Sequence, residues 1–363
     1  MPAMAQTTIP VTPDPRFIDV IEKSAAIEGQ KLLAAISREY MKPSVARGFA
    51  GLAVSAALYA GAVIGIAVLD QWYLIVPLIF IAGLGGWGMH CIGHDCGHGS
   101  FSRSRRLNFL VGHVALLPLL YPFHAWRHVH NWHHTHTNSL ELDNDWRPIS
   151  EAVYGRMPLR HRILYVSMRT WAVWAGSINY WVQSIRPSTF PKKATRREVL
   201  RSAVWVVAVG GAYLATLTYL TGWQGLLLCF VAPWLAIHTW FSITTLMHHS
   251  SEDIPFLPAQ YWTRNASKLL VTTDFMYPRW LLFLTHNISL HTAHHVSTAV
   301  PFYNLRKAQV ALRQAYPDMV RVEKASVPKL WNILRNCRFY DPITGLYSTH
   351  RMQRADPAKA GPA

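Results

Sequence analysis

The sequence predicts an all-α integral membrane protein, with four transmembrane helices in two hairpins and a cytoplasmic helical cap that holds a histidine-rich metal site. Three observations lead to this fold class. Hydrophobic residues make up 51% of the chain and charged residues only 15%, which is unusual for a soluble protein. Long apolar stretches occur in two pairs, with two histidine clusters after the first pair and a third after the second pair. We expect a single domain over residues 1–363.

Each pair of apolar stretches predicts a transmembrane hairpin. Every stretch is about twenty residues long, which is enough to cross a bilayer as a helix. The polar connection within each pair is short, so the two helices of a pair are expected to be antiparallel neighbours. The first hairpin covers residues 49–90 and the second residues 202–247. The individual stretches are residues 49–69, 72–90, 202–220 and 226–247.

The distribution of Lys and Arg predicts the orientation of these hairpins. No Lys or Arg occurs within residues 49–102 or 202–263, so both hairpin tips lack basic side chains. By the positive-inside rule the remaining segments, together with both termini, lie in the cytoplasm. These cytoplasmic segments are residues 1–45, 91–201 and 248–363.

Shorter stretches are interpreted as helices at the cytoplasmic interface. Residues 108–123 and 280–290 are apolar but too short to span a bilayer. Residues 163–184 are interpreted in the same way, with a fifth span as the alternative. Residues 18–40 predict an amphipathic helix before the first span.

The balance of charge is strongly basic. The chain carries 35 Lys and Arg against 19 Asp and Glu, a net charge of +16. No nucleic-acid-binding motif accompanies this excess, so we expect no nucleic-acid partner. In a membrane protein the excess indicates cytoplasmic surfaces that face anionic lipid headgroups. The same surfaces could attract an acidic electron-transfer partner.

The chain contains 19 His, and most of them are clustered. His94 and His98 form an HxxxH motif directly after the second span. Two HxxHH motifs follow, and a random chain of this composition would rarely contain even one. They comprise His130, His133 and His134, and then His291, His294 and His295.

The spacing within these motifs indicates metal binding. Residues at i, i+3 and i+4 share one face of a helix, so each motif projects its imidazoles to one side. Neutral imidazole binds Fe, Zn, Cu and Ni. Eight ligands exceed what one tetrahedral site needs, and they suit two metal ions. We expect His248, at the end of the fourth span, to supply a ninth ligand, whereas ligation by His249 or His286 is left open.

Carboxylates near the motifs are candidate partners of the metal ligands. A ligating imidazole usually donates its second N–H to a carboxylate or carbonyl, which fixes the tautomer. We expect this role for Asp95 and Asp143, with solvation or helix capping as the alternative.

The motifs and their flanking residues resemble one known family. Together they are similar to the membrane acyl-lipid fatty acid desaturases, and most of all to the Δ12 (omega-6) branch of bacterial and plastid type. The resemblance runs from about Gly86 to Arg306. The segments that carry it are GHDCGHGSF (93–101), LPLLYPFHAWRHVHNWHHTHTN (117–138), MHHSSEDIPF (247–256) and YPRWLLFLTHNISLHTAHHVSTAVPFYNLR (277–306).

This resemblance implies a di-iron enzyme that uses O2 to insert a cis double bond at Δ12 of an oleoyl chain. The chain would be esterified in a membrane phospholipid or glycolipid, and the enzyme would lie in a bacterial inner membrane with its active site in the cytoplasm. Electrons would come from a separate ferredoxin, or cytochrome b5, and its reductase. The implied iron ligands are His94, His98, His130, His133, His134, His248, His291, His294 and His295.

Three other functions use the same sequence features. An omega-3 desaturase or a fatty acyl hydroxylase would share the di-iron scaffold and the first hydrogen abstraction. A membrane metal carrier is the alternative from another class. However, its ligands should line a path near mid-bilayer, whereas the motifs here follow the spans.

Overall fold

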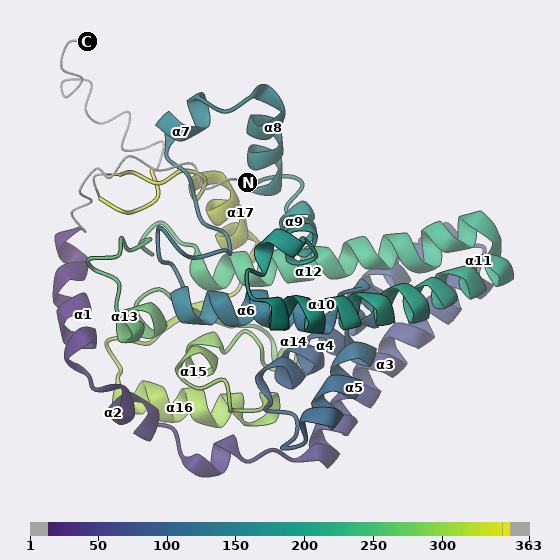
Figure 1. The fold of residues 1–363 in the computed structure, drawn as a ribbon, viewed down its shortest axis with the longest axis horizontal. Coiled ribbons are helices and arrows are strands. Elements are labelled where there is room, and N and C mark those ends of the chain that lie inside the picture. Colours follow the sequence, from purple (N-terminus) through teal and green to yellow (C-terminus); the bar gives the residue numbers. More distant parts are fainter. Residues whose placement is uncertain (1–13, 343, 349–363) are drawn as a thin grey trace.

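The computed structural model describes residues 14–342 and 344–348 and is mostly helical (Figure 1). The first half contains α1 (Pro15–Ala26), α2 (Gly29–Ala34), α3 (Val45–Val68), α4 (Trp72–His98), α5 (Arg105–Ala115), α6 (Phe123–His136), α7 (Glu151–Gly155), α8 (Leu159–Met168) and α9 (Trp174–Ser184). The second half contains α10 (Lys193–Trp205), α11 (Gly211–Leu226), α12 (Ala232–His249), α13 (Arg264–Leu269), α14 (Arg279–Leu284), α15 (His291–Val296), α16 (Leu305–Ala315) and α17 (Val327–Asn336).

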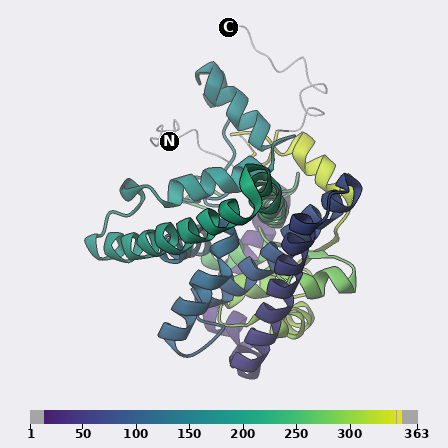
Figure 2. The ribbon, with the colours of Figure 1, turned by 90° about the vertical axis from the view of Figure 1, so that its right-hand side faces the viewer.

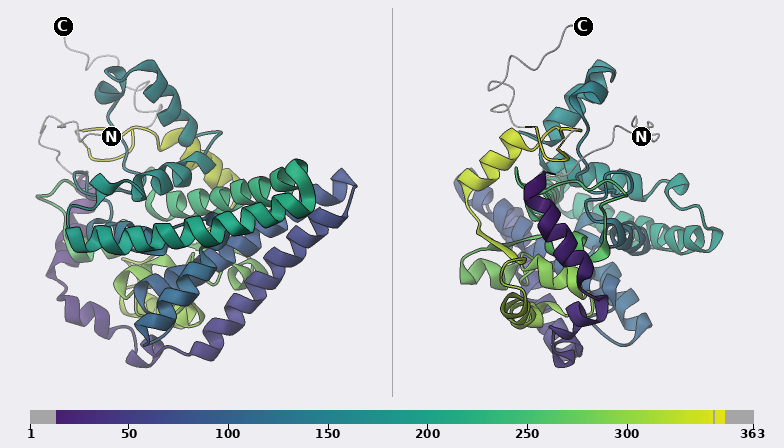
Figure 3. Two further views of the ribbon diagram at one scale, coloured as in Figure 1. Left: turned by 45° about the vertical axis from the view of Figure 1, so that its right-hand side comes forward. Right: turned by 90° about the vertical axis from the view of Figure 1, so that its left-hand side faces the viewer.

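Three helices of the described residues are long and apolar enough to cross a membrane. They are α3, α4 and a continuous helical stretch, Lys193–His249, that joins α10, α11 and α12 through two π-helical segments. Within this third stretch Gly222 has φ 70°, a backbone conformation that glycine adopts without steric cost. The chain reverses direction there, so that α12 runs back from the tip, as Figures 1 and 3 show. Figure 2 turns the tips of these helices toward the viewer.

Close packing of α4 against its neighbours depends on small residues. A Cβ on Gly83 would clash with Ala236 of α12, and a Cβ on Gly85 would clash with the backbone of Tyr59 in α3. The sequence of residues 83–88, GLGGWG, also matches the GxGxxG pattern of dinucleotide-binding sites. That motif requires a strand before it and a helix after it, whereas these glycines lie inside α4. Their role is therefore to let α3 and α12 approach α4.

The segments before, between and after the long helices pack together in one region, which we call the cap. Figure 3 shows α1, α13, α15 and α16 together at the end of the molecule opposite the helix tips. The all-α prediction did not include two short parallel strands here, β1 (Thr273–Met276) and β2 (Arg321–Lys324). Residues 163–184 form parts of α8 and α9, and neither helix is long enough to span a bilayer. Residues 18–40 form α1, α2 and a short 3₁₀ turn, not one continuous helix.

A hydrophobic core joins the long helices to the cap. Trp87 and Ile92 of α4 and Phe241 of α12 belong to the same buried cluster as Phe123 and Trp126 of α6. Trp87 and Trp126 are almost fully buried. Large buried aromatic side chains contribute strongly to packing, so this cluster fixes α6 against the ends of α4 and α12.

Candidate metal centre

The first histidine motif lies in the last two turns of α4. His94 and His98 are four residues apart and their rings lie 4.7 Å apart, centre to centre. The helix ends directly after His98 because Gly99 adopts φ 76°, the usual left-handed C-terminal conformation. Both imidazoles therefore project from the end of an apolar helix into the cap.

The other motifs come from two helices of the cap. α6 carries His130, His133 and His134, and the six-residue α15 carries His291, His294 and His295. The third motif lies on a short helix that packs against α16, α13 and strand β1. Long-range packing therefore brings together motifs that are separated by more than a hundred residues.

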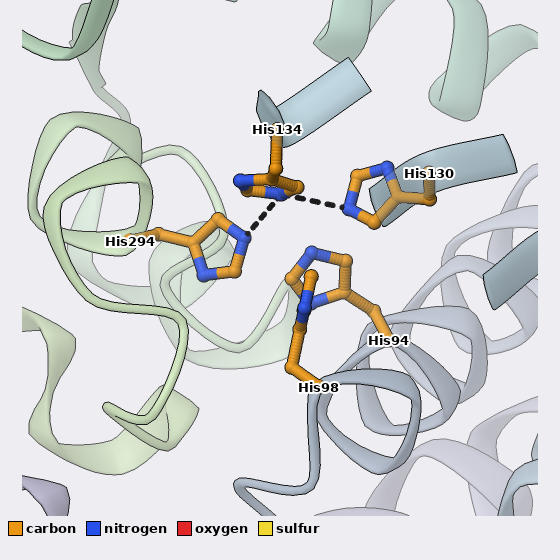
Figure 4. A group of neighbouring side chains, drawn as sticks. All are labelled: His94, His98, His130, His134 and His294. Carbon is orange, nitrogen blue, oxygen red and sulfur yellow. Dashed lines mark hydrogen bonds between the residues drawn. The ribbon is translucent and has the colours of Figure 1, made fainter. Parts of the chain in front are cut away.

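Five histidines from all three motifs form one candidate metal group (Figure 4). One ring nitrogen of each lies within 4.8 Å of the corresponding nitrogens of the others. His134 Nε2 is 3.1 Å from His130 Nε2 and 3.1 Å from His294 Nε2. His94 lies beside His294, with the ring centres 4.4 Å apart. The members are His94, His98, His130, His134 and His294.

A second group lies directly beside the first. It consists of His133, His249 and His295, all of them buried. The Nε2 atoms of His133 and His249 are 3.3 Å apart. His295 stacks on His134 of the first group at 4.2 Å between ring centres, so the two groups adjoin. The geometry thus provides two neighbouring sets of imidazole donors.

Two predicted ligands lie at the edge of the second group. His291 Nε2 is 3.0 Å from His295 Nε2, and the His248 ring stacks on His291 at 3.9 Å. Neither belongs to the sets whose nitrogens all converge. The structure therefore places seven of the nine predicted ligands in the two groups, with His248 and His291 adjacent to them.

The donors are suited to metal binding. Burial and the neighbouring histidines hold the pKa values of His130, His134 and His294 well below the ordinary range. These imidazoles are therefore neutral at pH 7, which is the form that binds metals. In addition, both ring nitrogens of His94 are buried without a hydrogen-bond partner. A cation between these rings would satisfy polar atoms that are otherwise costly to bury.

Asp143 is the carboxylate partner of His133 that the sequence predicts. Its Oδ1 lies 2.9 Å from His133 Nδ1, and it also accepts the backbone N–H of Asp145 at 3.0 Å. Its Oδ2 accepts the backbone N–H of Asn138 at 2.6 Å. Burial lowers the pKa of His133, but Asp143 and Asp145 outweigh this effect and raise the pKa above its ordinary value. Asp143 therefore directs Nε2 of His133 toward the second group.

Asp274 of β1 positions the third motif from outside it. Its Oδ1 accepts the backbone N–H of Thr292 at 2.7 Å, in the first turn of α15. Burial raises the pKa of this carboxyl to about 6, although the hydrogen bond from the Thr292 N–H opposes the shift. A six-residue helix has little stability of its own, so this contact helps to fix the direction of its histidines.

Other residues near the motifs have structural contacts. His286 Nε2 lies 2.8 Å from the Ser55 hydroxyl of α3, and His286 is in neither metal group. Asp95 Oδ2 accepts the backbone N–H of Phe302 at 2.9 Å, while its Oδ1 is 3.7 Å from His94 Nδ1. The His94 contact is longer than a hydrogen bond. Asp95 thus ties α4 to the segment after α15.

His249 is the group member that sequence reasoning did not select. His248 and His249 are adjacent, and spacing alone does not tell which of them faces the cluster. The structure turns His249 toward His133, while its Nδ1 lies 3.2 Å from the Val271 carbonyl. A carbonyl that holds the second nitrogen is typical of metal-binding histidines. In the sequence, the adjacent pair of histidines at the end of the last apolar helix is the signal from which His249 could have been found.

Comparison with known proteins identifies the family of this chain. Residues 70–324 match a family model described as fatty acid desaturase. The chain belongs to the fatty acid desaturase family. As an oxidoreductase of this family, the desaturase keeps all three histidine motifs within the matched residues.

Several relatives align over most of the desaturase. It is 34% identical over 332 residues to an sn-1 oleoyl-lipid 12-desaturase of Picosynechococcus sp., covering 91% of this chain and 95% of the relative. A protein of the same name from Arthrospira platensis is 40% identical over 243 residues, covering 67% and 69%. An sn-1 acyl-lipid omega-3 desaturase (ferredoxin) from a Nostoc species is 32% identical over 336 residues, covering 89% and 91%.

Proposed function

We propose that this desaturase inserts a cis double bond at Δ12 of an oleoyl chain esterified in a membrane lipid. The observation that carries the proposal is the pair of adjoining histidine groups at the end of apolar helices, in a chain similar to oleoyl-lipid 12-desaturases over most of its length. The reaction is R–CH2–CH2–R′ + O2 + 2 e⁻ + 2 H⁺ → R–CH=CH–R′ + 2 H2O.

Two iron ions are the proposed occupants of the histidine groups. When bound, iron supplies the oxidising power that O2 chemistry on an unactivated methylene requires. The first group, from all three motifs, would hold one ion, and His133, His249 and His295 would hold the other. His291 lies close enough to complete the second set, and His248 remains the ninth ligand predicted from the sequence. All three members of the second group are buried, as are His94 and His294 of the first, while the other three are partly buried. The chain thus limits the access of bulk water to the reacting centre.

The residues around the groups orient the donors. Asp143 fixes the tautomer of His133, and Asp274 fixes the start of α15. A cavity of about 20 Å³ adjoins His130 and is lined by Tyr180 of α9 and Phe241 of α12, among others. The chain thus supplies a rigid donor set beside apolar helices that lipid acyl chains can reach.

The membrane arrangement is part of the proposal. We propose that the reversal at Gly222 divides Lys193–His249 into two spans, which gives four spans in two hairpins. The positive-inside rule then places both termini and the histidine groups in the cytoplasm. In a bacterium the membrane would be the inner membrane, and residues 1–363 would form one desaturase domain.

Electrons would arrive from a separate protein. One relative carries ferredoxin in its name, and the net charge of +16 suits an acidic carrier. We therefore propose a ferredoxin and its reductase as the donor chain, with cytochrome b5 as the alternative.

Fatty-acid analysis of a host that contains oleate tests the function. Methyl esters are measured by gas chromatography–mass spectrometry with and without this chain and a ferredoxin donor. New linoleate is expected, and it should disappear in His133→Ala and His294→Ala but persist in His161→Ala, which lies outside both groups. A hydroxylated acid would indicate a hydroxylase, and a double bond at the omega-3 position would indicate the other desaturase branch. A folded, iron-loaded protein that forms none of these products would contradict the proposal.

A further inference from the structure

The helix that carries the second histidine motif also has an exposed face. Trp132 of α6, the residue before His133, is 47% exposed. Its indole Nε1 donates to the Leu142 carbonyl at 2.7 Å, and the Leu142 side chain is 49% exposed. Large apolar side chains at this level of exposure, held in place by a hydrogen bond, resemble the anchors of protein interfaces.

The Trp132 ring is held rigidly on this surface. It stacks on His136, one turn further along α6, with 4.1 Å between ring centres and 28° between planes. A preordered aromatic ring loses little conformational entropy when a partner covers it. Because Trp132 is bonded directly to His133, a partner at this face would lie a short distance from the second histidine group.

The helix α10, which packs against α6, carries exposed basic side chains. The N-terminal half of α10 packs against α6, where Glu198 accepts hydrogen bonds from Arg127 at 3.1 Å and lies 2.9 Å from His128 Nε2. Glu198 is therefore occupied by its own neighbours. Lys193 and Arg197 of α10 are exposed beside it. Exposed basic side chains thus lie on the helix that packs against the helix of Trp132.

We propose that this surface docks an acidic one-electron carrier protein, an inference that rests on the proposed function. We call it the α6 face and define it by Arg127, Trp132, Leu142, Lys193 and Arg197. An acidic carrier complements the cations and would bury the exposed indole, as protein interfaces combine a charged rim with an aromatic centre. Anionic lipid headgroups are the alternative counterpart of the α10 cations, and tryptophan also occurs at membrane interfaces, so binding measurements that vary both features distinguish the two occupants.

The redox balance requires two such encounters for each double bond. Each carrier is oxidised by one electron, so two reduced carriers provide the two electrons of the reaction. Together with two protons from the solvent and two hydrogen atoms from the acyl chain, they reduce one O2 to two waters. The carrier leaves after each transfer, which favours a small surface of moderate affinity.

Binding measurements with purified protein test the α6 face. The probe is an acidic [2Fe–2S] ferredoxin of plant type, titrated against the full-length protein in detergent at low and high ionic strength. The double variant Lys193→Glu/Arg197→Glu is compared with Arg156→Glu/Arg160→Glu, which reverses exposed cations of α7 and α8. Acidic residues in the first turns of α10 are compatible with the helix dipole, so the fold should persist.

We expect the α10 variant to weaken ferredoxin binding about ten-fold at low salt, with the difference shrinking at high salt as screening increases. Trp132→Ala should weaken it about ten-fold at both ionic strengths, whereas Trp331→Ala, an exposed tryptophan of α17, should change it less than about two-fold. Thermal melting and iron content accompany each measurement, and Trp132→Phe should restore most of the affinity.

Two results would overturn the proposal. In one, the α10 and α7–α8 variants affect ferredoxin affinity equally or not at all, which would assign the α10 cations to lipid headgroups. In the other, Trp132→Ala binds ferredoxin as the wild type does. The proposed function fails separately, through absence of linoleate when a chemical reductant replaces the carrier. Linoleate formation without ferredoxin binding would leave the function intact and remove the docking surface alone.

Discussion

Asp143→Asn should selectively weaken the second iron site. The Asp143 carboxylate is buried and accepts from His133 Nδ1 and from the backbone N–H groups of Asp145 and Asn138. An asparagine amide has one acceptor oxygen, so its NH2 group would face at least one of these donors. A hydrogen bond that involves a charged group contributes about 1.5–3 kcal/mol. Loss of such a partner typically lowers metal affinity about 10–100-fold, or roughly 1.4–2.7 kcal/mol.

The two magnitudes agree, so we expect a loss of about thirty-fold in affinity at the second group. Asp143 contacts no member of the first group through a hydrogen bond among the described residues, so that group should keep its ion. Competition with a graded series of chelators, followed by iron analysis, measures both affinities. Glu141→Gln changes an exposed carboxylate of the same loop and should bind iron like the wild type. Equal affinity and full iron content in Asp143→Asn would refute the assigned role of Asp143.

Three further predictions follow from other contacts. His249→Ala should lose the second iron, whereas His248→Ala should retain more of it, because only His249 places a ring nitrogen among the converging donors; iron content measures both. Asp274→Ala should reduce iron content and lower the free energy of unfolding by about 1–2 kcal/mol, since the Thr292 N–H at the start of α15 loses its acceptor. Gly88→Ala should destabilise the protein by about 1–3 kcal/mol, because its Cβ would clash with the Ser55 hydroxyl of α3; Gly61→Ala, with open space around it, should be neutral or slightly stabilising.

Each of these predictions has a contrary outcome. A larger iron loss in His248→Ala than in His249→Ala would favour the ligand chosen from the sequence. Unchanged iron content in Asp274→Ala would mean that α15 is held by its other packing contacts. Equal melting temperatures for Gly88→Ala and Gly61→Ala would show that α3 and α4 can separate without cost.

The long helices were predictable from the sequence because their information is local. Residues 49–69 correspond to α3 within four residues at each end, and α4 begins at residue 72 as predicted. A helix in lipid must be continuously apolar over its length, so composition alone marks it. The sequence did not indicate that α4 continues to His98, which places the first histidine motif on the same rigid helix.

The imidazole clusters could also be predicted from local sequence, because spacing at i and i+4 places two rings on one helix face. The division of the imidazoles into two groups could not be predicted in this way. His133 and His134 are adjacent, yet they enter different groups. Successive helical residues point about 100° apart, so neighbours in the chain face different surroundings. Only the packing of α4, α12 and α15 around α6 decided which rings meet.

The carboxylate contacts that orient the histidines also differ in whether they could be predicted from the sequence. Asp143 lies ten residues from His133, and its place near the motif made it a candidate carboxylate partner from the sequence, whereas the structure showed that its partner is His133. Asp274 reaches α15 from strand β1, and β1 exists through its pairing with the distant β2. The sequence by itself determined the apolar helices and the histidine motifs, because both depend on short-range patterns. The tertiary structure decided which histidines share a group and what orients them, because those distances depend on contacts between segments far apart in the chain.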